Sequence, residues 1–306
     1  MQGEAAKAGQ GPGLVDYALL LALSLIWGSS FMFMKVAVAG IAPASISFLR
    51  ALLGATIMIP IALAVGHRLP LGWRIAGLMV LAGLFGNAMP FTLIAWGQRH
   101  IDSGLAAITM GAMPLYTLVL AHLFTDDEKF NRVKLAGVLF GFVGIIVLIG
   151  PEKLLLMGDA TVGQLAVAGG GLCYATNAIV TKRITGLPRY ATVASVLSAS
   201  VAMMFPVASA SDFGLQPLSV FRDASWLSVG AVVVMGIVQT ALATVLMFQL
   251  IGRAGATFFS QLNFLVPLFG VVLGALVLGE RPGVNAWVAL ALIFTGIAVA
   301  RRGQRQ

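Results

Sequence analysis

One pattern occurs twice in this chain: SGLAAITMGAMPLYTLVLAHLFTDDEKFNRVKLAGVLFGFVGIIVLI at residues 103–149, and ATFFSQLNFLVPLFGVVLGALVLGERPGVNAWVALALIFTGIAVA at residues 256–300. Each copy holds two apolar runs joined by a short polar turn, and the two align with a one-residue gap. The matching positions are Pro114 and Pro267, Glu128 and Glu280, and Gly144 and Gly296. An apolar run of about 20 residues is long enough to cross a bilayer. The pattern therefore predicts two copies of a membrane-spanning helical hairpin.

Similar apolar runs fill most of the remaining chain. The 306 residues are 59% hydrophobic and 10% charged, with a mean hydropathy of +0.97. Soluble domains carry about 25% charged residues. We therefore predict an all-α polytopic membrane protein with ten transmembrane helices. The expected spans are 17–38, 44–65, 73–96, 103–124, 133–150, 162–181, 190–210, 225–248, 255–278 and 284–300.

The earlier spans of the two halves also match. WGSSFMFMK at 27–35 aligns with YATNAIVTK at 174–182, and Pro60 aligns with Pro206. Each half holds an odd number of spans, so the second copy must enter the membrane from the opposite face. Such inverted-topology repeats are common in secondary transporters. The predicted segments are a disordered tail at 1–16, five-helix repeats at 17–150 and 162–300, and a basic tail at 301–306.

The cations are distributed unevenly between the two faces. Of the 19 Lys and Arg residues, 13 fall on the side that holds both termini, four on the other side and two inside spans. Cytoplasmic loops carry the Lys and Arg excess. We therefore expect both termini in the cytoplasm. The net charge of +8 then reflects topology and gives no reason to expect a nucleic-acid partner.

Several function classes are disfavoured by what the spans lack. All eleven Asp and Glu residues fall in tails, loops or helix ends, which argues against an intramembrane site for sodium or a multidrug cation. The sequence has no HExxH or GxSxG motif and a single cysteine, Cys173. We expect no enzyme activity, no metal site and no cofactor.

Uncharged polar side chains gather in the first, third, fourth, sixth, eighth and ninth spans and are scarce in the fifth and tenth. This bias predicts a hydrated central cavity lined by six helices. The alternative is that amides and hydroxyls only join helices and that the aromatic rings fill the core. The candidate substrate-binding residues are Trp27, Asn87, Tyr116, Tyr174, Asn177, Gln239, Gln261 and Asn263.

Pro114 and Pro267 each lie near the middle of a span. Proline removes one backbone hydrogen bond and clashes with the carbonyl four residues earlier. Paired interruptions in corresponding helices point to a transport site. We predict that both prolines act as hinges, the alternative being a packing kink.

Three cationic or titratable residues are candidates for a charge role. Lys35 and Arg50 lie toward the predicted non-cytoplasmic face, where one of them could attract a substrate carboxylate. The alternative is that both side chains extend to the interface. His122 lies near the cytoplasmic end of the fourth span, which suits an interfacial role better than a proton relay.

The chain resembles the EamA-type ten-helix branch of the drug/metabolite transporter superfamily over roughly residues 17–300. The resemblance rests on WGSSFMFMK, on FLRALLGA around Arg50, on the AMP and LVP kinks, on the ERPG turn, and on Gly144 and Gly296. The first copy differs by carrying FTDDEKFN where the family often has a shorter Gly-Glu turn. In overall likeness the chain is most similar to bacterial amino-acid exporters of the YddG type, which move aromatic and some other neutral amino acids.

This resemblance implies a secondary transporter in the bacterial inner membrane that exports hydrophobic or aromatic amino acids by alternating access. Its partners would be a small-molecule substrate and the lipid bilayer, and a homodimer is left open. Two alternatives stay open: a carrier for another small metabolite, such as a purine or sugar derivative, and a structural or sensory membrane protein without flux.

Overall fold

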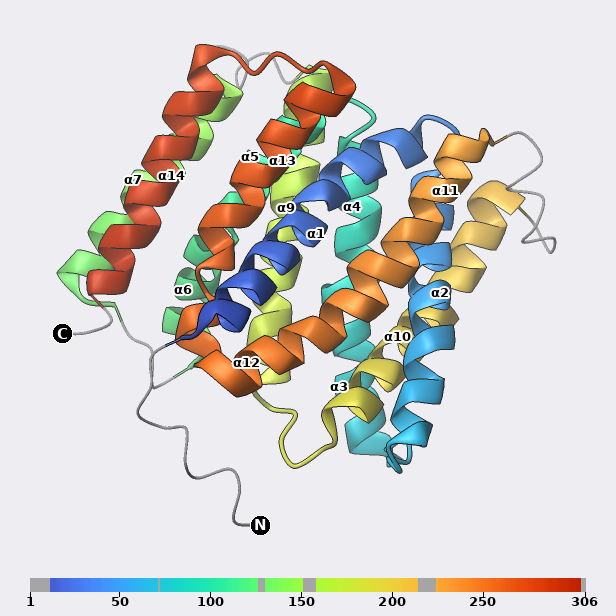
Figure 1. The fold of residues 1–306 in the computed structure, drawn as a ribbon. Coiled ribbons are helices and arrows are strands. Elements are labelled where there is room, and N and C mark those ends of the chain that lie inside the picture. The colour runs from blue at the N-terminus through green and yellow to red at the C-terminus, as the bar shows by residue number, and fades with distance from the viewer. Residues whose placement is uncertain (1–11, 71, 126–129, 151–157, 214–223, 304–306) are drawn as a thin grey trace.

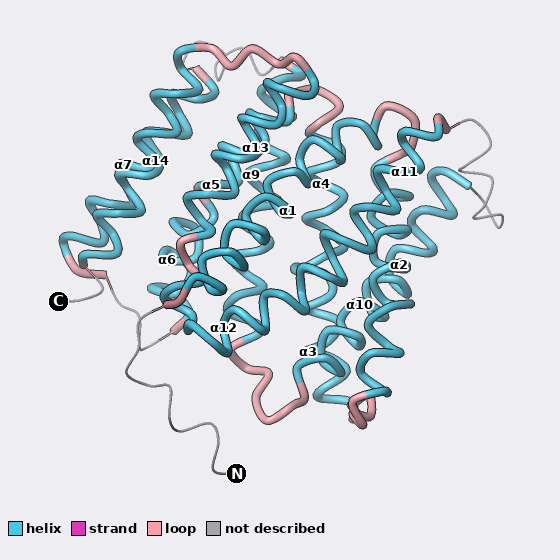
Figure 2. Tube along the Cα trace, viewed as in Figure 1, coloured by secondary structure: helices cyan, strands magenta, loops and turns pink. Residues whose placement is uncertain are grey.

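The computed structural model of the protein describes residues 12–70, 72–125, 130–150, 158–213 and 224–303. In these ranges the chain forms helices joined by short loops, and no strand occurs (Figures 1 and 2). Eight helical segments in the described ranges are long and apolar enough to cross a membrane. The all-α polytopic prediction is therefore confirmed.

The first half contains five helical segments at the predicted spans. Three of these are single helices, and two are interrupted. The bounds are α1 Leu14–Val38, α2 Pro43–Ala64, α3 Trp73–Gly83 with the π-helix η2 Leu84–Ala88 and α4 Met89–Gly97, α5 Ser103–Gly111 with α6 Met113–Phe124, and α7 Arg132–Ile149.

The second half repeats this plan. The bounds are α9 Asp159–Thr181, α10 Arg189–Ala208 with the π-helix η3 Ser209–Phe213, α11 Trp226–Val234 with the π-helix η5 Met235–Leu242 and α12 Ala243–Phe259, α13 Leu262–Leu278, and α14 Val284–Arg302. Two segments fall outside the eight: α13 has 17 residues, and α9 carries Gln164, three consecutive glycines and Asn177.

The predicted boundary between the eighth and ninth spans is wrong, since the eighth was expected to end at 248 and α12 runs to Phe259. The ninth span was expected to start at 255, yet Gly255 lies inside the segment assigned to α12, with φ 81° at a kink, and α13 begins only at Leu262. Glycine adopts this left-handed backbone without the steric penalty of a Cβ. The kink separates the regular helix before Gly255 from the short segment between Gly255 and Ser260.

The helices pair in matched sets. α7 packs against α14 and α2 packs against α10, while α1 packs against α13 and against α11 and α12. In turn α9 packs against α5 and α6 and against α4. Exchanging the two halves maps these pairs onto one another, as an inverted repeat requires. The first helix begins and the last helix ends at the same end of the bundle (Figure 1).

Glycines allow the closest of these crossings. A Cβ added to Gly137 of α7 would lie 2.5 Å from the carbonyl oxygen of Gly296 of α14, and the reverse addition gives the same distance. Small residues are how membrane helices approach closely. The glycine at position 296, which marked the repeat in the sequence, is therefore a packing position.

The end of the bundle opposite the termini is held by two charged side chains. Lys35 Nζ donates to the carbonyl oxygens of Gln98 (2.8 Å) and Ile101 (2.7 Å), beyond the end of α4. Glu280 accepts from the backbone N–H groups of Ser103 (2.7 Å) and Gly104 (2.9 Å), at the start of α5. Cations suit helix C-termini and anions suit N-termini. Both contacts fasten the turn between α4 and α5 to other helices.

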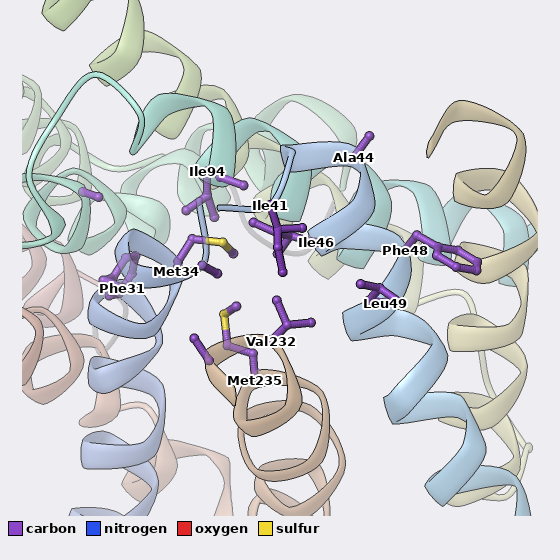
Figure 3. Close-up of a cluster of buried hydrophobic side chains, with 14 of the residues drawn as sticks. Phe31, Met34, Ile41, Ala44, Ile46, Phe48, Leu49, Ile94, Val232 and Met235 are labelled. Atoms are coloured by element: carbon purple, nitrogen blue, oxygen red, sulfur yellow. The ribbon is translucent and has the colours of Figure 1, made fainter. Parts of the chain in front are cut away.

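A buried apolar cluster fills the bundle on this side. In Figure 3 the side chains of Met34, Ile41, Ile46, Val232 and Met235 converge from α1, the turn after it, α2 and the α11–η5 segment. Each is at most 3% exposed. Such packing excludes water from this part of the interior.

Candidate functional site

A cavity of about 410 Å³ lies in the middle of the helical bundle. All six predicted lining spans contribute to it, and α2 adds Arg50. Among the described residues, α7 and α14 contribute nothing to its wall. The polar lining residues are Ser30, Arg50, Asn87, Tyr174, Gln239, Thr240, Thr244 and Asn263, and the other aromatic ones are Trp27, Phe31, Phe91 and Phe259.

Five of the predicted substrate-binding residues line this cavity: Trp27, Asn87, Tyr174, Gln239 and Asn263. The Trp27 indole is fixed by two contacts. Its Nε1 donates to the carbonyl oxygen of Gln239 at 3.1 Å, and its ring meets Phe259 edge-on at 6.1 Å. A partly buried tryptophan whose N–H is satisfied forms an apolar wall with a polar edge.

Two predicted residues lie elsewhere. Tyr116 is buried against α7, with its ring 5.7 Å from that of Phe142. Gln261 is exposed in the turn between α12 and α13. In both cases the helix is interrupted a few residues earlier, which rotates the following side chains away from the orientation of an unbroken helix. Neither residue belongs to the cavity wall.

A second cavity, of about 510 Å³, adjoins the first and shares Gly86, Asn87, Thr240 and Thr244 with it. Asn177 lines this second cavity, and its Oδ1 is buried without a hydrogen-bond partner. The cavity extends to the exposed residues Thr181 and Arg189, beside the loop between α9 and α10. This loop lies at the end of the bundle where α1 begins and α14 ends (Figure 1).

Both predicted hinge prolines line the central cavity, but they interrupt their helices differently. Gly111 ends α5 and Met113 begins α6, so the helix is broken just before Pro114. Pro267 lies inside the continuous helix α13, and the interruption in that half falls at Ser260–Gln261. Pro267 lies where α5 and α13 meet, since a Cβ on Gly111 would be 3.0 Å from Pro267 Cγ, and Pro114 follows three residues after Gly111.

The three charge candidates are separated in space. Lys35 binds the turn after α4, as described above. His122 lies at the end of α6, where its Nδ1 accepts from the Phe130 N–H at 3.1 Å and its ring stacks on Phe130 at 4.4 Å. Of the three, Arg50 alone lines the cavity.

Two π-helices present polar residues to the cavity, and sequence reasoning missed both. Asn87 lies in η2 and the pair Gln239–Thr240 lies in η5. The two π-helices occupy corresponding positions of the third and eighth spans. π-helical turns are rare and are frequent at functional sites. The available signal was the equivalence of Asn87 with Gln239 or Thr240, which indicated position but no change of helix type.

Within the described ranges, no group of three or more His, Cys, Asp or Glu side chains could hold a metal ion. The cavity lining contains neither a carboxylate nor a histidine among the described residues. The chemistry available there is hydrogen bonding, one guanidinium charge and aromatic contact. This combination can bind a small organic molecule of about the size that a 410 Å³ cavity admits.

Comparison with known proteins shows the family of the chain. The sequence model of the EamA-like transporter family matches residues 15–150 and 161–302. The chain belongs to the EamA-like transporter family. The two matched segments coincide closely with the two five-helix halves. The molecule is therefore a multi-pass membrane transporter by family.

Several curated relatives of this EamA-like transporter align over almost their whole length. The uncharacterized inner membrane transporter YedA of Escherichia coli K12 is 27% identical over 94% of this chain and 91% of its own. The uncharacterized transporter YoaV of Bacillus subtilis is 22% identical over 91% and 94%. A probable terminal-alkyne amino-acid exporter of Streptantibioticus cattleyicolor is 24% identical over 94% and 93%.

A solved crystal structure shares the fold. It matches this EamA-like transporter with a TM-score of 0.65 and 20% sequence identity, covering 95% of this chain and 99% of the other. The likeness extends to nearly all described helices and concerns their arrangement in space.

Proposed function

We propose that this EamA-like transporter exports hydrophobic or aromatic amino acids from the bacterial cytoplasm by alternating access around the central cavity. The observation that carries the proposal is the composition of the cavity wall. Aromatic and aliphatic side chains form most of it, and a small polar group around Arg50 and Gln239 occupies one region. Ligand sites with mostly apolar walls and a few placed polar groups suit such substrates.

The aromatic part of the wall suits a hydrophobic side chain. Trp27, Phe91 and Tyr174 come from three different helices and meet around one space. Rings in contact with an aromatic or aliphatic group contribute through buried area and, for aromatic pairs, about 0.5–1.5 kcal/mol more. A relative described as a probable terminal-alkyne amino-acid exporter supports the amino-acid class.

The access path supports export as the direction of loading. The second cavity runs from the central one to the end of the bundle that holds the termini, which the cation bias assigns to the cytoplasm. The apolar cluster around Met34 and Ile46 fills the other side, and Lys35 and Glu280 fasten the turn there. We therefore infer a cytoplasm-open state, from which substrate would be carried outward by rearrangement of the two five-helix repeats.

Flux in proteoliposomes that contain only this protein tests the proposal. Radiolabelled phenylalanine, tryptophan and leucine should exchange faster than in protein-free liposomes, and unlabelled substrate should compete. Adenine, a purine nucleoside and a sugar derivative serve as competitors from the other metabolite class. Saturable flux of these compounds, with none of the amino acids, would overturn the amino-acid assignment while keeping the transporter role.

A further inference from the structure

Arg50 is a buried cation in the wall of the cavity. Its side chain is held by α2, and the residue is 7% exposed. The guanidinium Nε donates to Thr240 Oγ1 at 3.0 Å, Nη1 contacts Ser30 Oγ at 3.4 Å, and Cζ lies 3.9 Å from the centroid of the Phe91 ring. The group is therefore fixed in position by three helices other than its own.

These contacts leave the positive charge without an anion. Both hydrogen-bond partners are neutral hydroxyls, and within the described ranges no carboxylate pairs with Arg50. The Thr240 hydroxyl donates its own hydrogen bond to the Met235 carbonyl at 2.9 Å, so it serves Arg50 as an acceptor only. A guanidinium has five N–H donors. A buried charge is costly unless an opposite charge compensates it.

Gln239, the neighbour of Thr240 in η5, carries a buried acceptor without a partner. The residue is 2% exposed and lines the cavity, and its Oε1 has no hydrogen-bond partner. The amide orientation follows from Ser29, whose hydroxyl donates to the Ile26 carbonyl at 2.8 Å. Its oxygen can then only accept from Gln239, at 3.2 Å, so Nε2 faces Ser29 and Oε1 is the free end.

The cation and the acceptor belong to one cluster. In α1, Ser29 bonds to the Gln239 amide and its neighbour Ser30 bonds to Arg50. In η5, Gln239 is followed directly by Thr240, which also bonds to Arg50. The wider turn of η5 brings two consecutive residues to the same wall. A ligand that satisfies both groups needs a carboxylate close to an N–H donor.

We propose that Arg50 and Gln239 form a two-point anchor for the free α-carboxylate and α-ammonium of the substrate, with Arg50 holding the carboxylate and Gln239 Oε1 the ammonium. This inference rests on the proposed transport of amino acids and narrows it to molecules with both groups unblocked. Esters, decarboxylated amines and deaminated acids of the same side chain are rejected, because each leaves one buried group unpaired.

Ligand binding to the purified full-length protein tests the anchor without requiring flux. The probes are phenylalanine, its methyl ester, phenethylamine and 3-phenylpropionate, followed by tryptophan fluorescence and thermal shift. Phenylalanine should bind at least about 100-fold more tightly than the ester or the amine. Arg50→Gln should abolish the preference for the free carboxylate. Gln239→Leu should lower the affinity for phenylalanine to that for 3-phenylpropionate. This variant should still bind phenylalanine more tightly than its methyl ester.

Two further variants guard against misfolding. Arg50→Lys retains the charge without the fork geometry, so it should bind phenylalanine about 10-fold more weakly and still prefer it to the ester. Arg99→Gln changes an exposed cation outside the cavity and should leave every ratio unchanged. If the unmodified protein binds the ester or the amine as tightly as phenylalanine, the anchor is wrong and transport of hydrophobic compounds stands. If it neither binds nor transports any amino acid, the anchor and the proposed function fall together.

Discussion

The Trp27 side chain lies deep in the helical bundle and is held in place by two neighbouring groups. Its indole N–H is satisfied by the Gln239 carbonyl, and its ring is held against Phe259, so the face that lines the cavity has little freedom to move. A rigid ring costs little entropy when a substrate packs on it. Trp27 therefore belongs to the part of the wall that would select side chains.

Trp27→Ala should raise the apparent KM for phenylalanine flux about 10-fold, which corresponds to about 1.4 kcal/mol of lost contact. Trp27→Phe should retain most of the affinity because it keeps an aromatic face. Initial rates against substrate concentration in proteoliposomes give the measurement. The matched control is Val143→Ala on α7, where the side chain is 48% exposed and outside the cavity. An equal loss in Val143→Ala would mean general destabilisation instead of a lost contact.

Most of the residues predicted for the cavity wall could be placed from sequence, and two that follow an interruption could not. Trp27, Asn87 and Gln239 were identified by their depth and by their equivalence between the halves, and all three line the cavity. Tyr116 and Gln261 were chosen by the same reasoning but follow breaks at Ala112 and in α12. A break changes the direction, around the helix axis, in which the following side chains point. That direction is set by packing against other helices instead of by the local sequence.

At the scale of elements, the two proline segments differ in what they leave flexible. In the first half α5 and α6 are separate helices, while α13 runs through Pro267. Both prolines line the central cavity, and Pro267 lies where α5 and α13 meet. Bending at these positions would change the width of the cavity.

Pro114→Ala and Pro267→Ala should each lower the transport rate about 10-fold or more, because a straighter helix resists the change between states, and both should melt at or above the temperature of the unmodified protein. Flux and thermal unfolding of the same preparations provide the two readings. Pro60→Ala is the control, since Pro60 also lies inside a helix but on an exposed face of α2. Normal flux in both cavity variants would make the prolines packing features only.

The π-helices are the elements that sequence reasoning could not supply. Their residues, LFGNA in η2 and MGIVQTAL in η5, read as ordinary apolar helix with one or two polar residues. A π-turn is stabilised by contacts from other helices, such as the bond of Thr240 to Arg50 on α2. The sequence of η5 contains only one of the two residues in that interaction, so it does not by itself indicate a π-helix.

For the whole molecule, the positions of the spans followed from hydropathy because lipid requires nearly every backbone group to be paired within a helix. Segment ends agreed within a few residues except between the eighth and ninth spans, where the limits expected at 248 and 255 fall inside α12 and where Gly255 forms a kink. The pairing of helices was not predictable in the same way. The α7–α14 and α2–α10 contacts depend on small residues meeting across the two halves, which hydropathy does not record.

Both termini are predicted to be cytoplasmic, from the excess of Lys and Arg on their side. An alkaline phosphatase fused after Gln306 should be inactive, and a fluorescent protein fused there should fold and fluoresce. A reporter pair placed in the loop between Gln98 and Ser103 should give the opposite readings. Reversal of the two patterns would place the open cavity on the outside and make loading from the cytoplasm wrong.

Transport is predicted to be facilitated and not proton-coupled. A proton-coupled carrier keeps a titratable carboxylate or histidine on its path, and the described cavity wall has neither. Net movement should follow the substrate gradient in either direction. With equal substrate on both sides of proteoliposomes, an imposed pH gradient should produce no accumulation. Accumulation that an uncoupler abolishes would contradict this prediction and direct attention to His122 and Lys35.

The bond between Arg50 and Thr240 also bears on how the chain is made. The two residues are 190 positions apart, so about 10–40 s of synthesis separates them. During that time α2 is already in the membrane. Its high hydropathy favours insertion, although an arginine at the centre of a span raises the free energy of insertion by about 2.5–3.5 kcal/mol. A fragment ending at residue 150 should be degraded faster than the full chain in pulse-chase, and Arg50→Leu should lengthen the life of the fragment alone. Until η5 leaves the ribosome, Arg50 lacks Thr240 as a partner, and we expect membrane proteases to recognise chains with this uncompensated charge as unfinished.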